Sequence, residues 1–312
     1  MILTVTLNSG VDKVLLVDEF FPGLPVNARK VVTSIGGKGL DVSVALRHLG
    51  LETCGLAFVA GETGKQLADL IDDYGIMPEL VWVGGETRTC YVIAESKPAR
   101  VGHIKYGELQ IESRQVERFF EVFQAHLPKS EWVICSGSIP PTLNNSIYRD
   151  LVLIAIQAGV KVLVDSSQQA LLCTLPAHPT ILKMNWDEFG WTFHEKVDTI
   201  EELIIKAHQI ATQNSITNLV ITCGSQGILA VTQSGLFLAR APVQEVVNAA
   251  GAGDGASAAL IWRLSLGDAW PEALKWSAAV SAATVLTEGT ADCRMSDVLS
   301  IYPETVVESF PI

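Results

Sequence analysis

Strand-like apolar runs alternate with helical stretches along most of this chain, and this alternation restricts the possible fold more than any other feature. Examples are MILTVTL at residue 1, TCGLAFVA at 53, EWVICSG at 131 and VKVLVDS at 160, with helical patterns between them. Continuous apolar strands are typical of parallel sheets whose two faces are both covered by helices. The sequence therefore predicts an α/β fold with a mostly parallel central sheet.

Composition and charge narrow the class of protein. The 312 residues, 48% hydrophobic, suffice for a large core, and without a linker or internal repeat we expect residues 1–312 to form a single domain. A formal charge of -12 argues against nucleic acid and membrane surfaces as partners. The start has no secretory pattern, and the six cysteines are scattered without a CxxC pair. We therefore expect a cytoplasmic protein.

Two segments, residues 12–35 and 86–106, interrupt the α/β pattern. Both lack helical periodicity and mix β-branched residues with Gly, Pro and polar positions. Such stretches favour short antiparallel strands. We predict that the two segments form a small β-sheet lid beside the main sheet.

A glycine-rich segment, VVNAAGAGDGASAAL, precedes a helical pattern near the C-terminal end. Gly251, Ala252 and Gly253 let the backbone approach a ligand closely, and the first turn of a helix leaves amide groups free to bind an anion such as phosphate. An acid at this place, Asp254, would repel phosphate unless it serves to accept a proton. On spacing alone, Asp254 is equally well interpreted as an ordinary first-turn acid.

A second glycine segment, SIGGKGLDVSVAL, repeats this arrangement from residue 34. Gly37 and its neighbouring glycines lead into a helix, with Lys38 at its mouth and Asp41 one turn further. Lys38 could meet an anion there, although a single lysine of this kind is more often solvated at the surface.

Seven short segments occur in a characteristic order: TLNSGVD, GGKGLD, TR at residue 87, SGSIPP, MNWDE, TCGSQG and GAGD. In this order they resemble the ribokinase-like (PfkB) carbohydrate kinases, in particular the phosphofructokinase and tagatose-6-phosphate kinase branch. The resemblance covers nearly the whole chain. It implies a ribokinase-like three-layer sandwich with a β-sheet lid, and ATP-dependent phosphorylation of a sugar hydroxyl.

The resemblance also implies roles for individual residues. Asp254 becomes the general base, and the amides of the GAGD segment form an anion hole. The substrate-binding positions are Asp12, Gly37, Lys38, Asp41, Arg88 and Ser138. Of these, Arg88 would grip the phosphate already present on the sugar, because an arginine fork suits a phosphate dianion. A surface salt-bridge arginine is the alternative interpretation.

For the nucleotide, the matching positions are Asn185, Thr222, Gly224 and Gly227, and Glu188 would hold Mg²⁺ through water. The spacing of Asn185 and Glu188 also fits a capping box at a helix start, and both interpretations can hold together. ATP and Mg²⁺ are the cofactors implied.

The chain departs from the family pattern at three places. Asp41 stands where relatives commonly have asparagine, which removes the donors of an amide. A second lid arginine is not clearly aligned: Arg100 and Lys105 flank the place, which Gly102 occupies. The run Asn248-Ala249-Ala250 replaces a motif near the monovalent-cation site of the family, which puts potassium activation in question.

Several functions therefore remain to be distinguished. The first is a kinase that converts a hexose monophosphate (fructose 1-phosphate, fructose 6-phosphate or tagatose 6-phosphate) to a bisphosphate. The second is a kinase for an unphosphorylated sugar or nucleoside, and the third is a catalytically idle sugar sensor. The six histidines show no zinc-binding spacing. A homodimer through the lid is a further expectation, because extended strands present edges to a twin.

Overall fold

A ten-stranded sheet forms the centre of the part of the chain that the computed structural model describes, which is residues 1–96 and 99–311. Its strand order is β16-β15-β14-β13-β12-β11-β10-β1-β4-β5. The seven strands from β5 to β13 run parallel, and β14, β15 and β16 are antiparallel. The strands are β1 (Ile2–Thr6), β4 (Thr53–Val59), β5 (Met77–Trp82), β10 (Trp132–Ser136), β11 (Lys161–Asp165), β12 (Ile181–Asn185), β13 (Leu219–Thr222), β14 (Ile228–Thr232), β15 (Gly235–Arg240) and β16 (Val306–Phe310).

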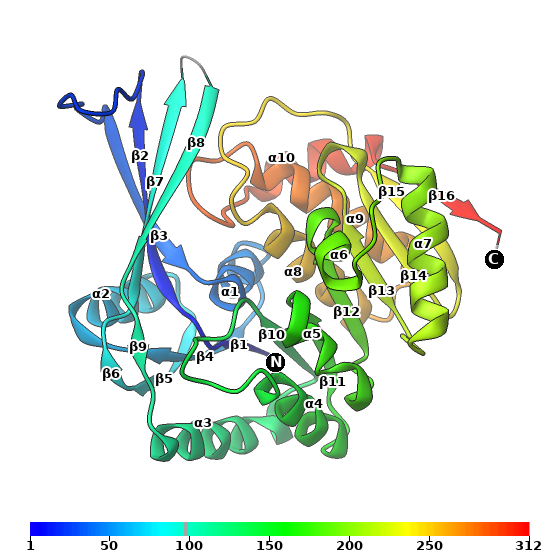
Figure 1. Ribbon diagram of the computed structural model, residues 1–312. Coiled ribbons are helices and arrows are strands. Elements are labelled where there is room, and N and C mark those ends of the chain that lie inside the picture. Colours follow the sequence, from blue (N-terminus) through cyan, green and yellow to red (C-terminus); the bar gives the residue numbers. More distant parts are fainter. Residues whose placement is uncertain (97–98, 312) are drawn as a thin grey trace.

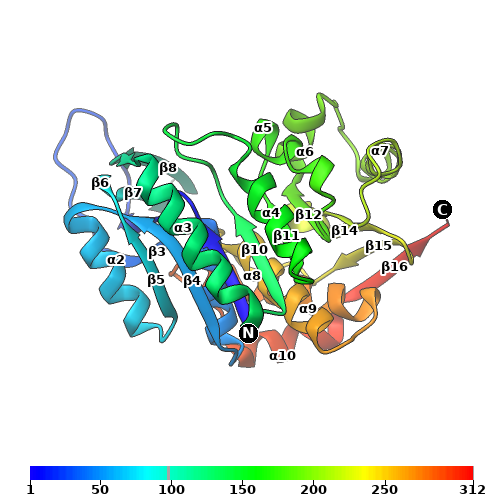
Figure 2. The ribbon, with the colours of Figure 1, turned by 90° about the horizontal axis from the view of Figure 1, so that it is seen from below.

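Helices cover both faces of this sheet, which gives three layers (Figure 2). One face carries α3 (Ser113–His126), α4 (Ile147–Gln157), α5 (Gln168–Leu172), α6 (Trp186–Phe193) and α7 (Ile200–Gln213). The other carries α1 (Lys38–His48), α2 (Gly61–Asp73), α8 (Ala252–Ser265), α9 (Trp270–Thr284) and α10 (Met295–Ile301). Short 3₁₀ turns are η1 (Leu127–Lys129), η2 (Leu175–Ala177), η3 (Gly224–Gln226) and η4 (Tyr302–Glu304). The predicted α/β sandwich is confirmed.

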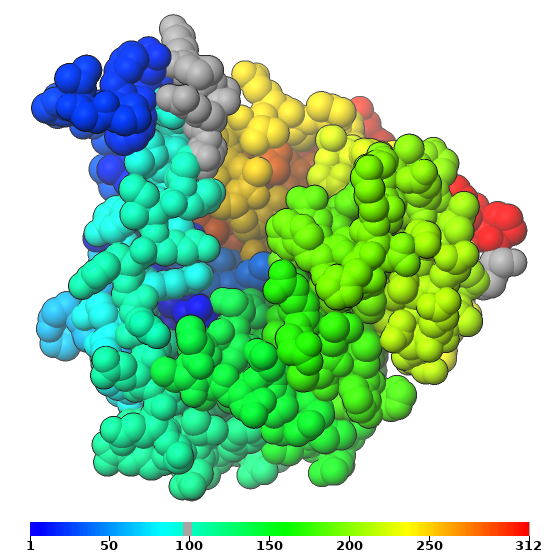
Figure 3. Space-filling model, viewed as in Figure 1, coloured from blue at the N-terminus to red at the C-terminus, as the bar shows by residue number. Residues whose placement is uncertain are grey.

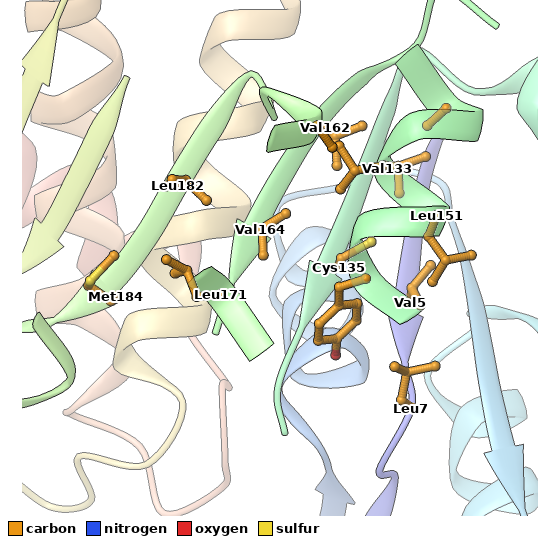
Figure 4. Packing of buried hydrophobic residues seen from close by; sticks show 14 of the residues in the cluster. Val5, Leu7, Val133, Cys135, Leu151, Val162, Val164, Leu171, Leu182 and Met184 are labelled. Carbon is orange, nitrogen blue, oxygen red and sulfur yellow. The ribbon is translucent and has the colours of Figure 1, made fainter. Parts of the chain in front are cut away.

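The core between the sheet and α4 and α5 shows why the strands read as apolar runs. Val5, Val133 and Val164 of adjacent strands point toward Leu151 and Leu171 of the covering helices (Figure 4). All five are fully buried. Burial of one such side chain stabilises the fold by about 1.5–3 kcal/mol, so two covered faces require strands that are apolar at consecutive positions.

A separate four-stranded sheet projects from the body of the molecule (Figure 1). It comprises β2 (Gly10–Val17), β3 (Lys30–Gly36), β7 (Arg88–Ser96) and β8 (Ala99–Tyr106), in the order β3-β2-β7-β8. A two-stranded ladder, β6 (Gly84–Gly85) with β9 (Leu109–Gln110), lies where the second pair leaves the body. We call the four-stranded sheet the lid sheet; its strands lie largely within the two segments, residues 12–35 and 86–106, that interrupt the α/β pattern.

One expectation for this sheet is wrong in part. We expected antiparallel strands, and β2 with β3 and β7 with β8 are indeed antiparallel, but β2 and β7 run parallel. Each pair leaves the body along its first strand and returns along its second. The order β3-β2-β7-β8 brings the two outgoing strands together, so they point the same way.

Candidate active site

The predicted site residues gather at the carboxyl edge of the central sheet, beneath the lid sheet. In an open α/β sheet this edge is where ligands bind. Ser138 follows β10, Asn185 ends β12 and Thr222 ends β13 directly beside it in register. Figure 3 shows the hollow between the lid sheet and the body of the molecule.

The glycine segment GAGD forms the start of α8, as predicted. Gly251 is the N-cap with φ 80° and ψ 0°, a left-handed conformation that favours glycine. A Cβ atom there would lie 2.2 Å from the backbone nitrogen of Ala291, so no larger residue fits without movement. The amide of Ala252 donates to the carbonyl of Ala249 at 3.3 Å, and the amide of Asp254 donates to the carbonyl of Gly251 at 3.0 Å. An anion bound here would have to share these donors.

Asp254 lies in the first turn of α8 and is only 7% exposed. Its Oδ1 atom has no hydrogen-bond partner within the described chain. Burial, together with the charge of Asp165, raises the pKa of Asp254 to about 7, although Lys38 and Lys183 act in the opposite direction. A carboxyl that titrates near neutral pH and keeps one oxygen free has the properties of a general base.

Gly37 and Lys38 open helix α1, which packs against α8. Gly37 has φ 107°, and a Cβ there would lie 2.9 Å from the side chain of Thr6. Lys38 is half-buried and paired rather than free in solvent: its Nζ is 3.1 Å from Asp165 Oδ1 and 2.9 Å from Glu188 Oε1. Burial alone would lower the pKa of Lys38, but these two carboxylates outweigh burial and raise it. Lys38 is therefore a fixed cation at the helix mouth.

Asp165 and Lys183 complete this charged cluster, and sequence reasoning missed both. Their side chains are 1% and 3% exposed and lie 2.5 Å apart, on neighbouring strands in register. Burial would raise the pKa of Asp165, but Lys183 and Lys38 outweigh it and lower the pKa. The signal in the sequence was a single charge within an apolar strand, as in ILKMN, or at its end, as in VLVDS.

Three carboxyls from separate elements come together on the side of the lid sheet. Asp41 of α1 is 5% exposed with its Oδ1 unpartnered. Burial, followed by the charges of Asp254 and Asp12, raises the pKa of Asp41 well above its ordinary value. Asp12 of β2 also has a raised pKa, through burial that the charge of Arg88 partly offsets. Its Oδ2 lies 3.5 Å from Thr290 Oγ1.

Arg88 begins β7 and stands beside Gly10 of β2 in register. Its Nε is buried without a hydrogen-bond partner in the described chain. This removes the main support for a surface salt bridge at Nε. Burial of an unpaired donor costs free energy unless a ligand accepts a hydrogen bond from it, so the side chain of Arg88 is available to bind an anion.

Ser138 and the second lid cation complete the predicted set. Ser138 Oγ accepts a hydrogen bond from Asn8 Nδ2 at 3.0 Å. Gly102 of β8 pairs with Ile93 of β7 and has open space around it, and Lys105 of β8 pairs with Cys90 of β7. The side chain of Arg100 lies outside the described residues.

The nucleotide positions line a cavity of about 400 Å³. It is lined by Asn185, Thr222, Gly224 and Gly227, together with Ala252 and Gly253 of the GAGD segment. Ala278, Ala282 and Val285 contribute apolar wall. The cavity and the three carboxyls therefore meet at the first turn of α8.

Asn185 and Glu188 form the capping box that the sequence allowed. Asn185 Oδ1 accepts from the Glu188 amide and Glu188 Oε2 accepts from the Asn185 amide, both at 2.8 Å. Because Glu188 Oε1 also accepts from Lys38, the carboxylate is oriented by two donors, the Asn185 amide and the Lys38 ammonium. Within α6, Phe189 is buried, whereas Trp191 is 59% exposed.

Comparison with known proteins decides the family. The family model for pfkB family carbohydrate kinases matches residues 6–297. This chain belongs to that family. It is a carbohydrate kinase, a phosphotransferase with an alcohol group as acceptor.

The relatives of this kinase act on hexose phosphates by name. It is 29% identical to D-tagatose-1-phosphate kinase of Bacillus licheniformis over 95% of this chain and 96% of the relative. It is 28% identical to 1-phosphofructokinase of Haemophilus influenzae over 98% and 99%. Phosphofructokinase-2 from Escherichia coli, solved in complex with potassium, superposes with TM-score 0.87 at 22% identity over 97% and 98%. The kinase thus has the ribokinase-like fold, and its relatives support a hexose phosphate kinase.

Proposed function

We propose that this kinase transfers the γ-phosphoryl group of ATP to a hydroxyl of a hexose monophosphate, with fructose 1-phosphate, fructose 6-phosphate and tagatose 6-phosphate as candidates. The observation that carries the proposal is the position of Asp254. This carboxyl stands between the nucleotide cavity, which Ala252 and Gly253 line, and the carboxyls Asp12 and Asp41. All of residues 1–312 would act as one kinase domain.

The chemistry follows from this position. Asp254 accepts the proton of the sugar hydroxyl while the hydroxyl oxygen forms a bond to the γ-phosphorus. The bond from that phosphorus to the β–γ bridging oxygen breaks, its electron pair stays on the bridging oxygen, and ADP leaves. Gly251 keeps the turn open, so that the amides of Ala252, Gly253 and Asp254 stabilise the charge on the transferred group.

Substrate contacts are assigned by charge and hydrogen-bonding capacity. Asp12 and Asp41 would bind sugar hydroxyls, because carboxyl oxygens accept hydrogen bonds from them. Arg88, supported by Lys38 and Ser138, would bind the phosphate of the substrate. Gly37 leaves room at the mouth of α1 for that group.

The nucleotide side uses Asn185, Thr222, Gly224 and Gly227 along the ATP phosphates. The described residues contain no group of three or more metal-ligating side chains, and the Glu188 side chain already accepts two hydrogen bonds. This arrangement fits Mg²⁺ held by phosphate oxygens and reached by Glu188 through water. When bound, the ion would neutralise phosphate charge.

Location and assembly remain predictions. In the described chain no helix has both the length and the apolar character needed to cross a membrane. Cytoplasmic location rests on the six cysteines, all of which are free. We also propose a homodimer through the lid sheet.

ADP release over a panel of acceptors tests the function. The panel contains the three candidate hexose phosphates and tagatose 1-phosphate, the matching unphosphorylated sugars, ribose and adenosine. We expect one of the hexose phosphates to have the highest kcat/KM of all the acceptors in the panel. A preference for an unphosphorylated sugar or nucleoside would establish the second function. Sugar binding without ADP release from any acceptor would establish a sensor.

A further inference from the structure

The departure Asn248-Ala249-Ala250 lies where a loop, residues 285–292, meets the start of α8. The segment and the loop are joined by backbone hydrogen bonds. The amides of Val247 and Asn248 donate to the carbonyl of Val285 at 2.8 and 3.2 Å, and the amide of Ala291 donates to that of Ala250 at 3.2 Å. Family resemblance implies a monovalent-cation site in this neighbourhood, where backbone carbonyls would take the place of the ion's water.

Two side chains already donate hydrogen bonds to backbone carbonyls in and beside this loop. Asn248 Nδ2 donates to the carbonyl of Glu288 at 3.0 Å and lies 3.5 Å from that of Gly289. Asn248 Oδ1 accepts from the amide of Ala250 at 3.0 Å. The hydroxyl of Thr287 lies 3.0 Å from the carbonyl of Thr284 and 3.0 Å from that of Asp292.

These contacts do not fit a bound cation at the Asn248 amide. A side-chain NH₂ group carries two donor hydrogens with partial positive charge, and here it lies between two carbonyl oxygens that a cation would need. An acid at this position would have no donor and a serine only one, so neither could bridge both carbonyls. Hydrogen bonds from the asparagine amide thus stabilise the carbonyl oxygens that a cation would otherwise stabilise by its charge.

The loop held by Asn248 also supports the proposed substrate site and the lid sheet. Glu288 forms an ion pair with Lys30 of β3. Thr290 lies 3.2 Å from Ser34 of β3 and 3.5 Å from Asp12. Movement of the loop would therefore reach both the anion-binding turn and a sugar-binding carboxyl.

We propose that the side-chain amide of Asn248 takes the structural place of a monovalent cation, so that this kinase neither binds potassium there nor depends on it. Asn248 is a positioning residue, since it acts through the loop. The part of this proposal that concerns catalysis rests on the proposed function; the part that concerns ion binding does not.

The test compares the wild type with Asn248→Asp and Asn248→Ser in chloride salts of potassium, sodium and tetramethylammonium at equal ionic strength. Asn214→Ser is the matched control, because Asn214 Nδ2 also donates to a backbone carbonyl, that of Ile210 at 2.9 Å, but far from the site at the end of α7. Two quantities are measured: the melting temperature without substrates, and the rate of ADP release.

The wild type and Asn214→Ser are expected to melt at the same temperature in all three salts. Asn248→Asp should melt at a lower temperature in tetramethylammonium and regain on the order of 2–4 °C in potassium, with a parallel recovery of rate. If the Asn248→Asp variant does not fold, the same comparison is made with Asn248→Ser. Specific stabilisation of the wild type by potassium would overturn the proposal, as would variants as indifferent to potassium as the wild type. If no ADP is released in any salt, the proposed function fails and the melting temperatures still decide this proposal.

Discussion

Lys183 Nζ and Asp165 Oδ2 lie 2.5 Å apart on adjacent parallel strands, and neither side chain is more than 3% exposed. The second oxygen of Asp165 accepts from Lys38 at 3.1 Å, so one carboxylate joins the interior of the sheet to the mouth of α1. Buried charges of this kind persist only when they are paired. The pair therefore fixes the geometry around which the other charged groups are arranged.

Replacing Lys183 by methionine should destabilise the fold. The change leaves Asp165 buried with Lys38 as its remaining cation among the described residues, and loss of one partner of a buried pair costs about 3–5 kcal/mol. We expect a fall of that order in the free energy of unfolding measured in urea. Lys196→Met is the control, because Lys196 pairs with Asp198 at the exposed surface and should change stability by about 0.5 kcal/mol or less. Equal stability of the two variants would contradict the buried-pair argument.

Asp254→Asn should lower kcat by about 100-fold or more, because an amide cannot accept the hydroxyl proton. The circular dichroism spectrum should be unchanged, since asparagine has nearly the same size. In the wild type, kcat/KM should fall about tenfold for each pH unit below the pKa of about 7. A variant with near-normal turnover would exclude Asp254 as the base.

The same carboxyl makes stability depend on pH. Between its ordinary pKa of 3.8 and its folded value of about 7, the folded chain binds more protons at Asp254 than the unfolded chain does. The stabilising contribution is therefore complete below pH 3.8 and is lost as pH rises to about 7. As pH rises across this window, the free energy of unfolding of Asp254→Asn should therefore increase relative to that of the wild type. A difference that stays constant with pH would show that the pKa is not raised.

Asp41 indicates how much of the site could be predicted from the sequence. Glycine spacing and segment order located Asp41, Lys38 and Asp254, because each stands at a helix start that local sequence specifies. Nothing local specified that Asp165 would face Lys183, since this depends on the register of two strands 18 residues apart. The parallel pairing of β2 with β7 was missed for the same reason: it is set by the order of strands in space.

Asp41→Asn should keep most of the activity. The neighbouring carboxyls and burial raise the pKa of Asp41 well above its ordinary value, and a protonated carboxyl, like an amide, has both a donor and an acceptor. The wild-type KM for the sugar phosphate should increase as pH rises and Asp41 loses its proton, whereas the KM of the variant should not follow this ionisation. Asp41→Leu, which can form no hydrogen bond, should raise KM at every pH. Parallel KM profiles for the wild type and Asp41→Asn would contradict this view.

Arg88→Ala should raise KM for the hexose phosphate by about 10–100-fold, the value of one or two charge-assisted hydrogen bonds. Arg88→Lys should recover only part of this loss, because lysine lacks the planar fork. Arg149→Ala is the control, since Arg149 pairs with Asp150 and is 42% exposed. An unchanged KM in Arg88→Ala would remove the main support for a phosphorylated substrate.

The two faces of the lid sheet differ in a way that suggests how two copies associate. Asp12 and Arg88 lie on one face, whereas Tyr91 and Ile104 are paired in register on the other. On this opposite face Tyr91 is 37%, Val31 54% and Ile104 57% exposed. Apolar side chains exposed next to one another are typical of protein interfaces, so we propose this face as the dimer contact.

Light scattering after size-exclusion chromatography should give the wild type a mass of two 33.6 kDa chains. Ile104→Glu should yield single chains, because a carboxylate within an apolar contact remains unpaired. Leu266→Glu should stay dimeric, since Leu266 is 62% exposed but follows α8, away from the lid sheet. If the dimer persisted in Ile104→Glu, or if the wild type had the mass of one chain, the outer face of the lid sheet would not be the contact that joins two copies.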